Sequence, residues 1–431
     1  MHEFSEAEVL ITSKEPLTRS KYFMHRAGEK MGLDKPTIRD IINPQQVVIL
    51  RLPVKFWGKV FVVWGCIALH NNARGPYKGG IRIAYDVDLW ETVELSRLMT
   101  LKTSISDIEF GGGKTGIRMK MQDAYDYLGK GERDIEFEKA LSLDICEEFA
   151  YQSRRYLEDL SYIPAPDMGT GPEEMAFIYN QTLNPASVTG KPEGIHGWLP
   201  GRKESTGYGC CTAALRLIKD VLDIRPENAS MAVQGFGNVG SNACLYLSEK
   251  GVKIQAVTDV YGGVYDSGGL DIKALCEYAR KEGTVRGFTQ QTITNEELFS
   301  LDADVLMPAA MGNVISKENA HAIRAKGIVE AANVPVTYDA VDILEEKGIK
   351  VIPDIVANCG GVIASMEEYS RSLSAIKIEK EDVFRIIDEK INSSLDAVFK
   401  KSADENISFS EAAVQLALER VYDAMRKRRH I

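Results

Sequence analysis

Three lysines in the first half of the chain lie in settings that differ from an ordinary solvated surface. Lys78 lies in RGPYKGGIR, Lys114 in FGGGKTG, and Lys102 in MTLKTS near the end of a helical pattern. A single lysine is more commonly a surface residue, but glycines beside Lys78 and Lys114 expose backbone and leave room for a ligand. Asp167 follows in IPAPDMGTG, where a loop carboxylate held between prolines and glycines can point into a cleft. Together these residues predict a cleft in which lysines bind a carboxylate.

A second set of residues predicts a dinucleotide site. Gly235, Gly237 and Gly240 form GxGxxG directly after the predicted strand SMAVQ and at a predicted helix start. The glycines permit a tight turn and close approach to a pyrophosphate, which the helix N-terminus attracts. Asp259 ends the next predicted strand about 20 residues later, where an acid hydrogen-bonds the adenosine ribose. The alternative is that the glycines serve only helix–strand packing and Asp259 caps a turn. A methyltransferase could share this loop, so the loop alone leaves the chemistry open.

The elements that must position these residues divide the first half into strands and helices. Helical periodicity over residues 17–43 predicts two helices, and residues 46–82 are rich in the β-branched and aromatic residues of strands. Residues 87–106 and 134–158 have helical periodicity. Residues 111–114, GGGK, are predicted as a glycine loop before the short strand GIRMKM.

The second half alternates short apolar strands with helical segments. The strands are SMAVQ, KIQAVTD, ADVLMPAA, GIVEAAN and IKVIPDIVA, and they predict a parallel sheet covered on both faces. Three helical segments follow, and the proline- and glycine-rich residues 183–204 mark the best boundary. We therefore expect a first domain over residues 1–190, a nucleotide-binding domain over 191–357, and C-terminal helices over 358–431.

The composition indicates a folded protein and excludes some classes of partner. The 431 residues are too many for one ordinary core, and 44% hydrophobic and 26% charged residues are typical of a folded chain. The net charge of −10 argues against nucleic acid or an anionic membrane as the main partner. The first 17 residues lack the features of a signal peptide, and no apolar run approaches the roughly 20 residues that span a bilayer.

The cysteines are scattered, with no CxxC and no histidine at ligand spacing. This pattern predicts reduced thiols in a cytoplasmic protein, with neither a disulfide framework nor a metal site. The seven cysteines are Cys66, Cys146, Cys210, Cys211, Cys244, Cys276 and Cys359.

Long segments of the chain resemble the successive signatures of the glutamate dehydrogenases. They are HNNARGPYKGGIR, MTLKTS, FGGGKTGIR, PAPDMGTG, GRKESTGYG, VQGFGNVG, EAANVP and PDIVANCGGVIAS, in the family's order and over nearly the whole chain. The resemblance implies an α/β fold with an N-terminal substrate and oligomerisation domain, a Rossmann-like NAD(P)-binding domain, and C-terminal helices packing back on the first domain. It also implies a homohexamer that converts L-glutamate to 2-oxoglutarate and ammonia, reversibly.

The resemblance assigns roles to residues. Lys114 is the cation for the carbinolamine oxygen, Asp167 the proton shuttle, and Lys102 the ligand of the substrate α-carboxylate. Other substrate-pocket residues are Asn358, Gly361 and Val362. The cofactor-binding residues are Thr206, Gly235, Phe236, Gly237, Asn238, Val239, Gly240, Asp259 and Asn333.

Substrate choice depends on Lys78 and Ser365, which in glutamate enzymes hold the side-chain carboxylate. Related leucine, phenylalanine and valine dehydrogenases have an apolar residue at the lysine position, because a fixed ammonium would be unpaired beside an apolar substrate. Both Lys78 and Ser365 are present, so the resemblance favours glutamate. The alternatives are a dehydrogenase for an apolar amino acid, a regulatory partner in a mixed oligomer, and a generic nucleotide-binding module.

Two departures bear on the lysine loop, and one observation bears on the cofactor. Glu109 stands where the family usually has proline, and Thr115 where it has glycine or alanine. Asp259 is followed by Val260 and Tyr261 and would repel a 2′-phosphate, which favours NAD over NADP. Arg286 could reach back and permit NADP as well.

Overall fold

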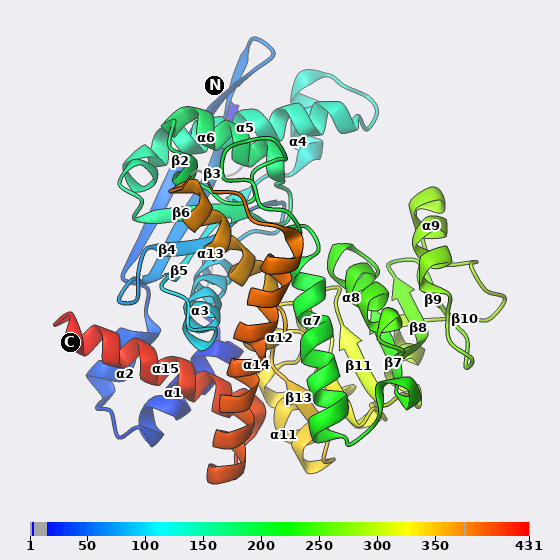
Figure 1. The fold of residues 1–431 in the computed structure, drawn as a ribbon. Helices are drawn as coiled ribbons and strands as arrows, with labels where there is room; N and C mark the ends of the chain where they lie inside the picture. The colour runs from blue at the N-terminus through cyan, green and yellow to red at the C-terminus, as the bar shows by residue number, and fades with distance from the viewer. Residues whose placement is uncertain (1, 4–14, 375, 431) are drawn as a thin grey trace.

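Two α/β halves and a set of C-terminal helices make up the fold. The computed structural model describes residues 2–3, 15–374 and 376–430. One sheet and its helices occupy the upper left of Figure 1 and the second sheet the lower right, with α7, α12 and α14 between them. This arrangement confirms the predicted fold class.

The first sheet is mixed, with strand order β1-β3-β5-β4-β6 and β2 paired to β3. Strand β5 pairs antiparallel to β3 and parallel to β4, which also pairs parallel to β6. Alternate residues of β3 face opposite cores: Ile67 and Leu69 pack with α5, and Cys66 and Ala68 with α3. The strands are β1 His2–Glu3, β2 Gln46–Phe56, β3 Lys59–Asn71, β4 Tyr77–Ala84, β5 Gly111–Arg118 and β6 Tyr162–Pro166.

The helices of this half include two that follow the predicted pattern closely. Helix α3 begins after Asp88, whose carboxylate accepts from the Glu91 amide, and α5 begins after Asp134, which caps it in the same way. Strand β6 and helices α4 and α6 were not predicted, because they are short and their sequences carry little periodicity. The helices are α1 Arg19–Lys30, α2 Lys35–Ile42, α3 Leu89–Ile105, α4 Met121–Leu128, α5 Ile135–Glu158 and α6 Pro172–Thr182.

The glycine run of FGGGK was predicted as a loop, and this prediction is wrong. Gly111, Gly112 and Gly113 begin strand β5 itself. A Cβ atom at Gly112 would lie 2.2 Å from Thr100 Oγ1 and 2.4 Å from the Ser96 carbonyl oxygen. The absence of a side chain there lets helix α3 approach the sheet closely, so the run serves packing between two elements that a local pattern does not reveal.

The second sheet confirms the predicted parallel strands. Its order is β10-β9-β8-β7-β11-β12-β13, and the strands from β8 to β13 along this order are parallel. Strands β9 and β10 extend one edge antiparallel and were not predicted. The strands are β7 Ser230–Gln234, β8 Lys253–Asp259, β9 Gly262–Tyr265, β10 Thr292–Ile293, β11 Val305–Pro308, β12 Gly327–Val329 and β13 Lys350–Ile352. The helices are α8 Asn238–Glu249, α9 Ile272–Glu282, α10 Asn295–Phe299 and α11 Tyr338–Glu346.

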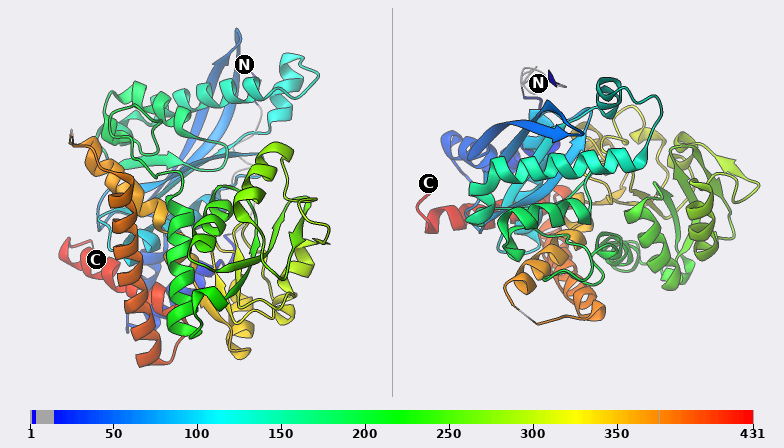
Figure 2. Two further views of the ribbon diagram at one scale, coloured as in Figure 1. Left: turned by 45° about the vertical axis from the view of Figure 1, so that its right-hand side comes forward. Right: turned by 90° about the horizontal axis from the view of Figure 1, so that it is seen from above.

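The remaining helices join the halves. Helix α14 runs beside α7, and α15 returns to pack on α1 and α3, as Figures 1 and 2 show. These helices are α7 Ser205–Arg216, α12 Asp354–Ala357, α13 Gly360–Ser372, α14 Lys380–Glu405 and α15 Phe409–Lys427. The domain boundaries at residues 190 and 357 stay a prediction. Within the described residues, no helix has the length and apolar character to cross a membrane.

Candidate functional site

Lys114 and Asp167 form an ion pair at the centre of the candidate site. Lys114 lies within β5, and Asp167 follows the end of β6. Both belong to one sheet in which β4 lies between β5 and β6, and the Lys114 ammonium donates to Asp167 Oδ2. Arg82 from β4 approaches the same carboxylate oxygen at 3.5 Å. A Cβ at Gly80 would lie 2.8 Å from the Asp167 Cβ and 3.3 Å from Lys114 Nζ, so this glycine makes room for the pair.

The pair is shielded from water, which changes the pKa of both groups. Burial lowers the pKa of Lys114, and the charges of Arg82 and Lys102 add to this effect against the attraction of Asp167. Burial alone would raise the pKa of Asp167, but Lys114 and Arg82 hold it below its usual value. The structure therefore favours a charged aspartate and a lysine that gives up its proton more readily than normal.

The departure at Thr115 affects packing and not the ion pair. Its hydroxyl lies 2.9 Å from the Tyr162 hydroxyl, and both side chains are fully buried. Glu109 is exposed and lies before β5.

Lys78 lies on β4, deep in the protein, with 1% of its surface exposed. No described residue gives its ammonium a hydrogen bond or an ion pair. Burial lowers its pKa well below normal, and nearby Arg202, Lys191 and Lys114 add to this effect while Glu368 opposes it. An uncompensated buried cation is costly, and it is a group that an anionic ligand would stabilise.

Three charged residues around Lys78 were not singled out in the sequence. Lys191 and Glu368 form a fully buried ion pair at 3.0 Å, and Glu368 also accepts from the amides of Gly190 and Lys191. Arg202 has a buried Nε with no hydrogen-bond partner among the described residues, and burial lowers its pKa. Arg202 lies in GRKESTGYG, so its position in that motif was the available signal.

The other predicted substrate residues lie on α13, on α3 and directly after the end of α12. Ser365 is buried on α13, where its hydroxyl donates to the Gly361 carbonyl at 2.9 Å. A Cβ at Gly361 would lie 2.5 Å from Thr206 Oγ1 and 3.5 Å from Arg202 Nη1, so α13 and α7 meet closely there. Val362 is half-buried beside them.

Lys102 joins the two halves of the protein. It is buried near the end of α3, and its ammonium donates to Asn333 Oδ1 in the loop after β12. The amide of Asn358 donates to the carbonyls of Ala331 and Ala332 at 3.2 and 3.1 Å, while its Oδ1 is buried with no partner among the described residues. Asn358 Oδ1 can accept a hydrogen bond from a ligand, and the Nε–H of Arg202 can donate one.

The GxGxxG loop has the backbone that a pyrophosphate requires. Gly235 has φ +96°, and a Cβ at Gly240 would lie 1.9 Å from the Gly235 carbonyl oxygen, so both positions need glycine. Gly237 precedes the first residue of α8. Asn238 is exposed there and donates to the Lys203 carbonyl at 2.8 Å. Phe236 and Val239 pack partly into the core. These residues fit a dinucleotide at the end of the parallel strands.

Asp259 ends β8 as predicted, and its carboxylate accepts hydrogen bonds from three groups of the protein. Oδ1 accepts from the Tyr261 amide at 2.8 Å, and Oδ2 accepts from the Thr284 hydroxyl and the Val285 amide, both at 2.7 Å. Both lone-pair sites of Oδ2 are used, but Oδ1 accepts only one hydrogen bond and can still accept another. The predicted turn-capping role and a ribose contact are therefore compatible in one residue.

Comparison with known proteins agrees with this geometry. The sequence profile "Glutamate/Leucine/Phenylalanine/Valine dehydrogenase" matches residues 197–429, and "Glu/Leu/Phe/Val dehydrogenase, dimerisation domain" matches residues 44–184. The glutamate dehydrogenase of Thermotoga maritima is 38% identical, with 94% of this chain and 96% of the relative covered. The NADP-specific enzyme of Saccharolobus shibatae is 35% identical over 94% and 95%, and the NAD-specific enzyme of Staphylococcus aureus 34% over 96% and 98%.

Solved structures give the same result. The hetero-hexameric glutamate dehydrogenase of Thermus thermophilus superimposes with a TM-score of 0.85 and 28% identity, over 96% of this chain and 99% of that one. The glutamate dehydrogenase of Peptoniphilus asaccharolyticus gives 0.80 and 28%, over 98% and 100%. The parallel sheet, the glycine loop and the lysine–aspartate pair are the features of a dinucleotide-dependent dehydrogenase. Within this class, the chain belongs to the Glu/Leu/Phe/Val dehydrogenase family.

Proposed function

We propose that the protein is a glutamate dehydrogenase, which oxidatively deaminates L-glutamate to 2-oxoglutarate and ammonia with hydride transfer to NAD(P), and runs in reverse. The observation that carries the substrate assignment is the buried ammonium of Lys78, which has no hydrogen-bond or ion-pair partner in the part of the chain that the structure describes. A carboxylate at the end of the substrate side chain would give this cation a partner. An apolar side chain would leave it unpaired at a cost of several kcal/mol.

The charge of the whole cleft supports a substrate with two carboxylates. The cations around it are Lys78, Lys102, Lys114, Lys191, Arg82 and Arg202. Three carboxylates pair with them, Asp167 with Lys114, Glu368 with Lys191 and Glu91 with Arg82, which leaves more cations than carboxylates. The excess positive charge favours a dianion such as 2-oxoglutarate.

The ion pair of Lys114 and Asp167 suits the chemistry at the α-carbon. Lys114, with its lowered pKa, can stabilise a developing carbinolamine oxygen and exchange a proton with it. Asp167 stays charged and can accept a proton from the substrate amine. We assign Lys102, Asn358, Gly361 and Val362 to the α-carboxylate end of the pocket, and Ser365 to the far end beside Lys78. A bound nicotinamide dinucleotide would supply the hydride acceptor.

The cofactor site follows from the glycine loop. We assign Gly235, Phe236, Gly237, Asn238, Val239 and Gly240 to the pyrophosphate, Thr206 and Asn333 to the nicotinamide side, and Asp259 to the adenosine ribose. NAD is the favoured cofactor because the Asp259 carboxylate would repel a 2′-phosphate. Arg286 lies close to Gly262, three residues after Asp259, since its Cδ would be 3.9 Å from a Cβ there. Its positive charge could bind a 2′-phosphate, so NADP stays possible.

One experiment tests both the substrate and the cofactor. Initial rates of NADH and NADPH formation are measured with glutamate, leucine and norvaline. We expect glutamate with NAD to give the highest kcat/KM. A higher kcat/KM for leucine or norvaline would replace glutamate with an apolar substrate, and no rate with any of them would favour a regulatory partner. A strong preference for NADPH would refute the role of Asp259.

The assembly and compartment are part of the same proposal. We propose a homohexamer: a hexamer is supported by the hetero-hexameric structural neighbour of Thermus thermophilus, and a subunit interface by the apolar residues Val47 and Ile49, which are exposed on β2. Sedimentation should give a mass six times that of the 47.8 kDa chain. A cytoplasmic location is supported by the free thiols of all seven cysteines.

A further inference from the structure

The N-terminal segment of residues 15–20 contacts three separate parts of the protein. It lies against helix α3, which carries Lys102, and against the loop of residues 330–337, which carries Asn333. It also contacts the start of α15. None of its residues has a role in the chemistry proposed above.

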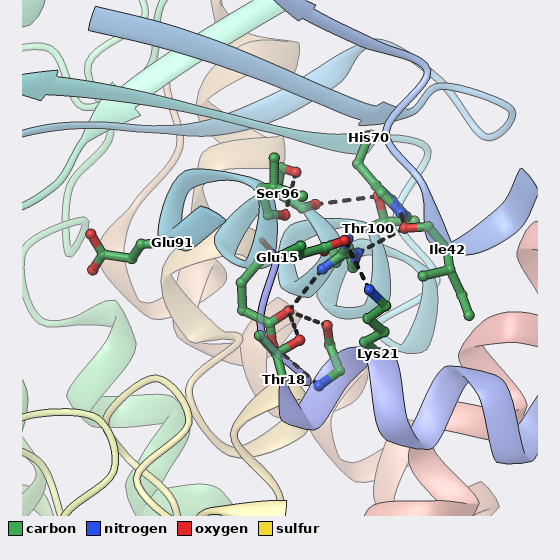
Figure 3. Close-up of polar contacts among 12 residues, drawn as sticks. Glu15, Thr18, Lys21, Ile42, His70, Glu91, Ser96 and Thr100 are labelled. Carbon is green, nitrogen blue, oxygen red and sulfur yellow. Dashed lines mark hydrogen bonds and ion pairs between the residues drawn. The ribbon is translucent and has the colours of Figure 1, made fainter. Parts of the chain in front are cut away.

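The contacts with α3 are polar and mostly buried. Glu94 of α3 accepts hydrogen bonds from the Ser20 amide at 3.1 Å and from the hydroxyls of Thr18 and Ser20. Arg97, which is fully buried on the same helix, pairs with Glu15 and with Glu94. Figure 3 shows Glu15, Thr18 and Lys21 grouped next to the helix that carries Ser96 and Thr100. The segment is thus fixed to the helix that carries Lys102.

The contact with the other half is made by Arg19. Its guanidinium pairs with the fully buried Glu330 and donates to the Val336 carbonyl and the Ser410 hydroxyl, both at 3.1 Å. Glu330 also accepts from the Asp354 amide at 2.8 Å. Burial, opposed by the attraction of Arg19, raises the pKa of Glu330 to about 7, so the carboxylate depends on Arg19 for its charge near neutral pH.

These two sets of contacts have one consequence for the site. Lys102 on α3 donates to Asn333, three residues after Glu330. Lys102 and Asn333 belong to different halves of the protein. The segment of residues 15–20 contacts both α3, which carries Lys102, and the loop of residues 330–337, which carries Asn333. A change in the segment would therefore change where Lys102 lies relative to the loop.

We propose that Arg19 and Glu330 are positioning residues, which hold the loop of residues 330–337 against α3 and thereby set the position of Lys102 for the substrate α-carboxylate. The proposal rests on the proposed function in assigning Lys102 to the substrate. Arg19 and Glu330 themselves do not touch substrate.

The test separates positioning from stability. Glu330→Leu leaves the buried Arg19 charge unpaired, and Arg19→Met leaves Glu330 buried without its cation, so that it takes up a proton; each variant should lower the melting temperature and the activity. The double variant Arg19→Met/Glu330→Leu replaces the pair with apolar contacts, which commonly restores stability. We expect it to melt near the wild-type temperature while kcat/KM for glutamate stays about 10- to 100-fold low, mainly through KM. Recovery of both quantities would overturn the proposal.

A milder variant keeps the test valid if the double variant does not fold. Arg19→Lys retains the charge beside Glu330 but cannot reach Val336 and Ser410 at the same time. We expect faster amide hydrogen exchange in residues 330–337, unchanged exchange in strand β7, and a raised KM for glutamate. Unchanged exchange in the loop would contradict the proposal, and this readout does not depend on turnover. An inactive wild-type enzyme would instead count against the proposed function.

The control is another arginine that joins two elements. Arg216 of α7 pairs with Asp396 of α14 at 2.6 Å and has no contact with the loop of residues 330–337 in the described structure. Arg216→Met should lower the melting temperature and leave the KM for glutamate unchanged. A KM increase as large as that of Arg19→Lys would show that any lost interdomain contact has this effect, and would overturn the proposal.

Discussion

The protonation states of Lys114 and Asp167 depend on two opposing effects, burial and their mutual attraction. Burial favours the neutral lysine, whereas the lysine and Arg82 favour the charged aspartate. Removal of Lys114 would leave Asp167 beside Arg82, still with a cation at 3.5 Å. The fold should therefore tolerate a change that the chemistry does not.

We predict that Lys114→Ala folds but loses turnover by several orders of magnitude, because the developing oxyanion and the proton exchange both lose their cation. The measurement is the single-turnover rate of NADH formation, with circular dichroism as the check on folding. Retention of more than about a tenth of the wild-type rate would show that Lys114 is not catalytic.

Lys78 gives a prediction about specificity. Lys78→Leu, alone or with Ser365→Val, should leave the distal carboxylate of glutamate unpaired at a cost of roughly 2–5 kcal/mol. This corresponds to a loss of about 30- to several-thousand-fold in kcat/KM for glutamate. Norvaline should lose much less or gain, because the groups at the α-carbon are intact. An equal fall for both substrates would mean that Lys78 supports the fold or the catalytic strand in general.

The lowered pKa of Lys78 predicts a pH dependence. In the unfolded chain Lys78 holds its proton up to the usual pKa of 10.5, so between the lowered folded value and 10.5 stability should rise with pH. Binding of 2-oxoglutarate should reverse the shift and take up a proton, so affinity should fall as pH rises through the same window. Calorimetry in two buffers of different ionisation enthalpy measures this uptake. Lys78→Met should abolish it, and persistence of the uptake would assign it to another group.

At the scale of elements, the site depends on how closely α3 lies against β5. Besides the contact at Gly112, the buried His70 of β3 lies 2.8 Å from Thr100 Oγ1 and 3.0 Å from the Ile42 carbonyl oxygen. Burial lowers the pKa of His70 to about 3, so it stays neutral in this contact at working pH. Helix α3 is therefore fixed from both the sheet and the N-terminal segment, and this fixes the backbone position of Lys102.

We predict that Gly112→Ala forces α3 away from the sheet, because the added Cβ meets backbone and side-chain atoms of Thr100 within 2.3 Å. Such overpacking costs about 1–3 kcal/mol or more, so both the melting temperature and kcat/KM should fall. Gly113→Ala is the matched control, since the three atoms nearest to its Cβ would be side-chain atoms of Tyr162 and Tyr77 at 3.0 to 3.1 Å. A larger loss for Gly113→Ala would contradict the role of this close approach.

At the scale of the whole molecule, the net charge is −10, but the candidate site around Lys78 and Lys114 has more cations than carboxylates. An anion that neutralises these cations should stabilise the folded protein. We predict that 2-oxoglutarate at 100 times its Kd stabilises the protein by about 2.7 kcal/mol. The monoanion 2-oxopentanoate, which has the same chain length, should raise the melting temperature much less. Equal shifts with both anions would show that the far end of the pocket does not require a carboxylate.

The sequence by itself determined the features that depend on residues close together along the chain. The strands of the second sheet follow from short apolar runs between helical segments, and the glycine loop with Asp259 follows from turn chemistry within one strand–helix–strand unit. The residues of the lysine–aspartate site were predictable because long motifs carry them. Their roles stay proposals until the variants are measured.

Only the tertiary structure decided which of these residues meet and which glycines serve packing. The FGGGK run is a strand because it pairs with β3 and β4, and its glycines let α3 pack on it from another part of the chain. Arg202, Lys191 and Glu368 act on Lys78 from separate segments; burial lowers the pKa of Lys78, Arg202 and Lys191 add to this effect, and Glu368 opposes it. Arg19 and Glu330 are 311 residues apart in the sequence. Burial and electrostatic contact depend on distance in space, which no local pattern of residues encodes.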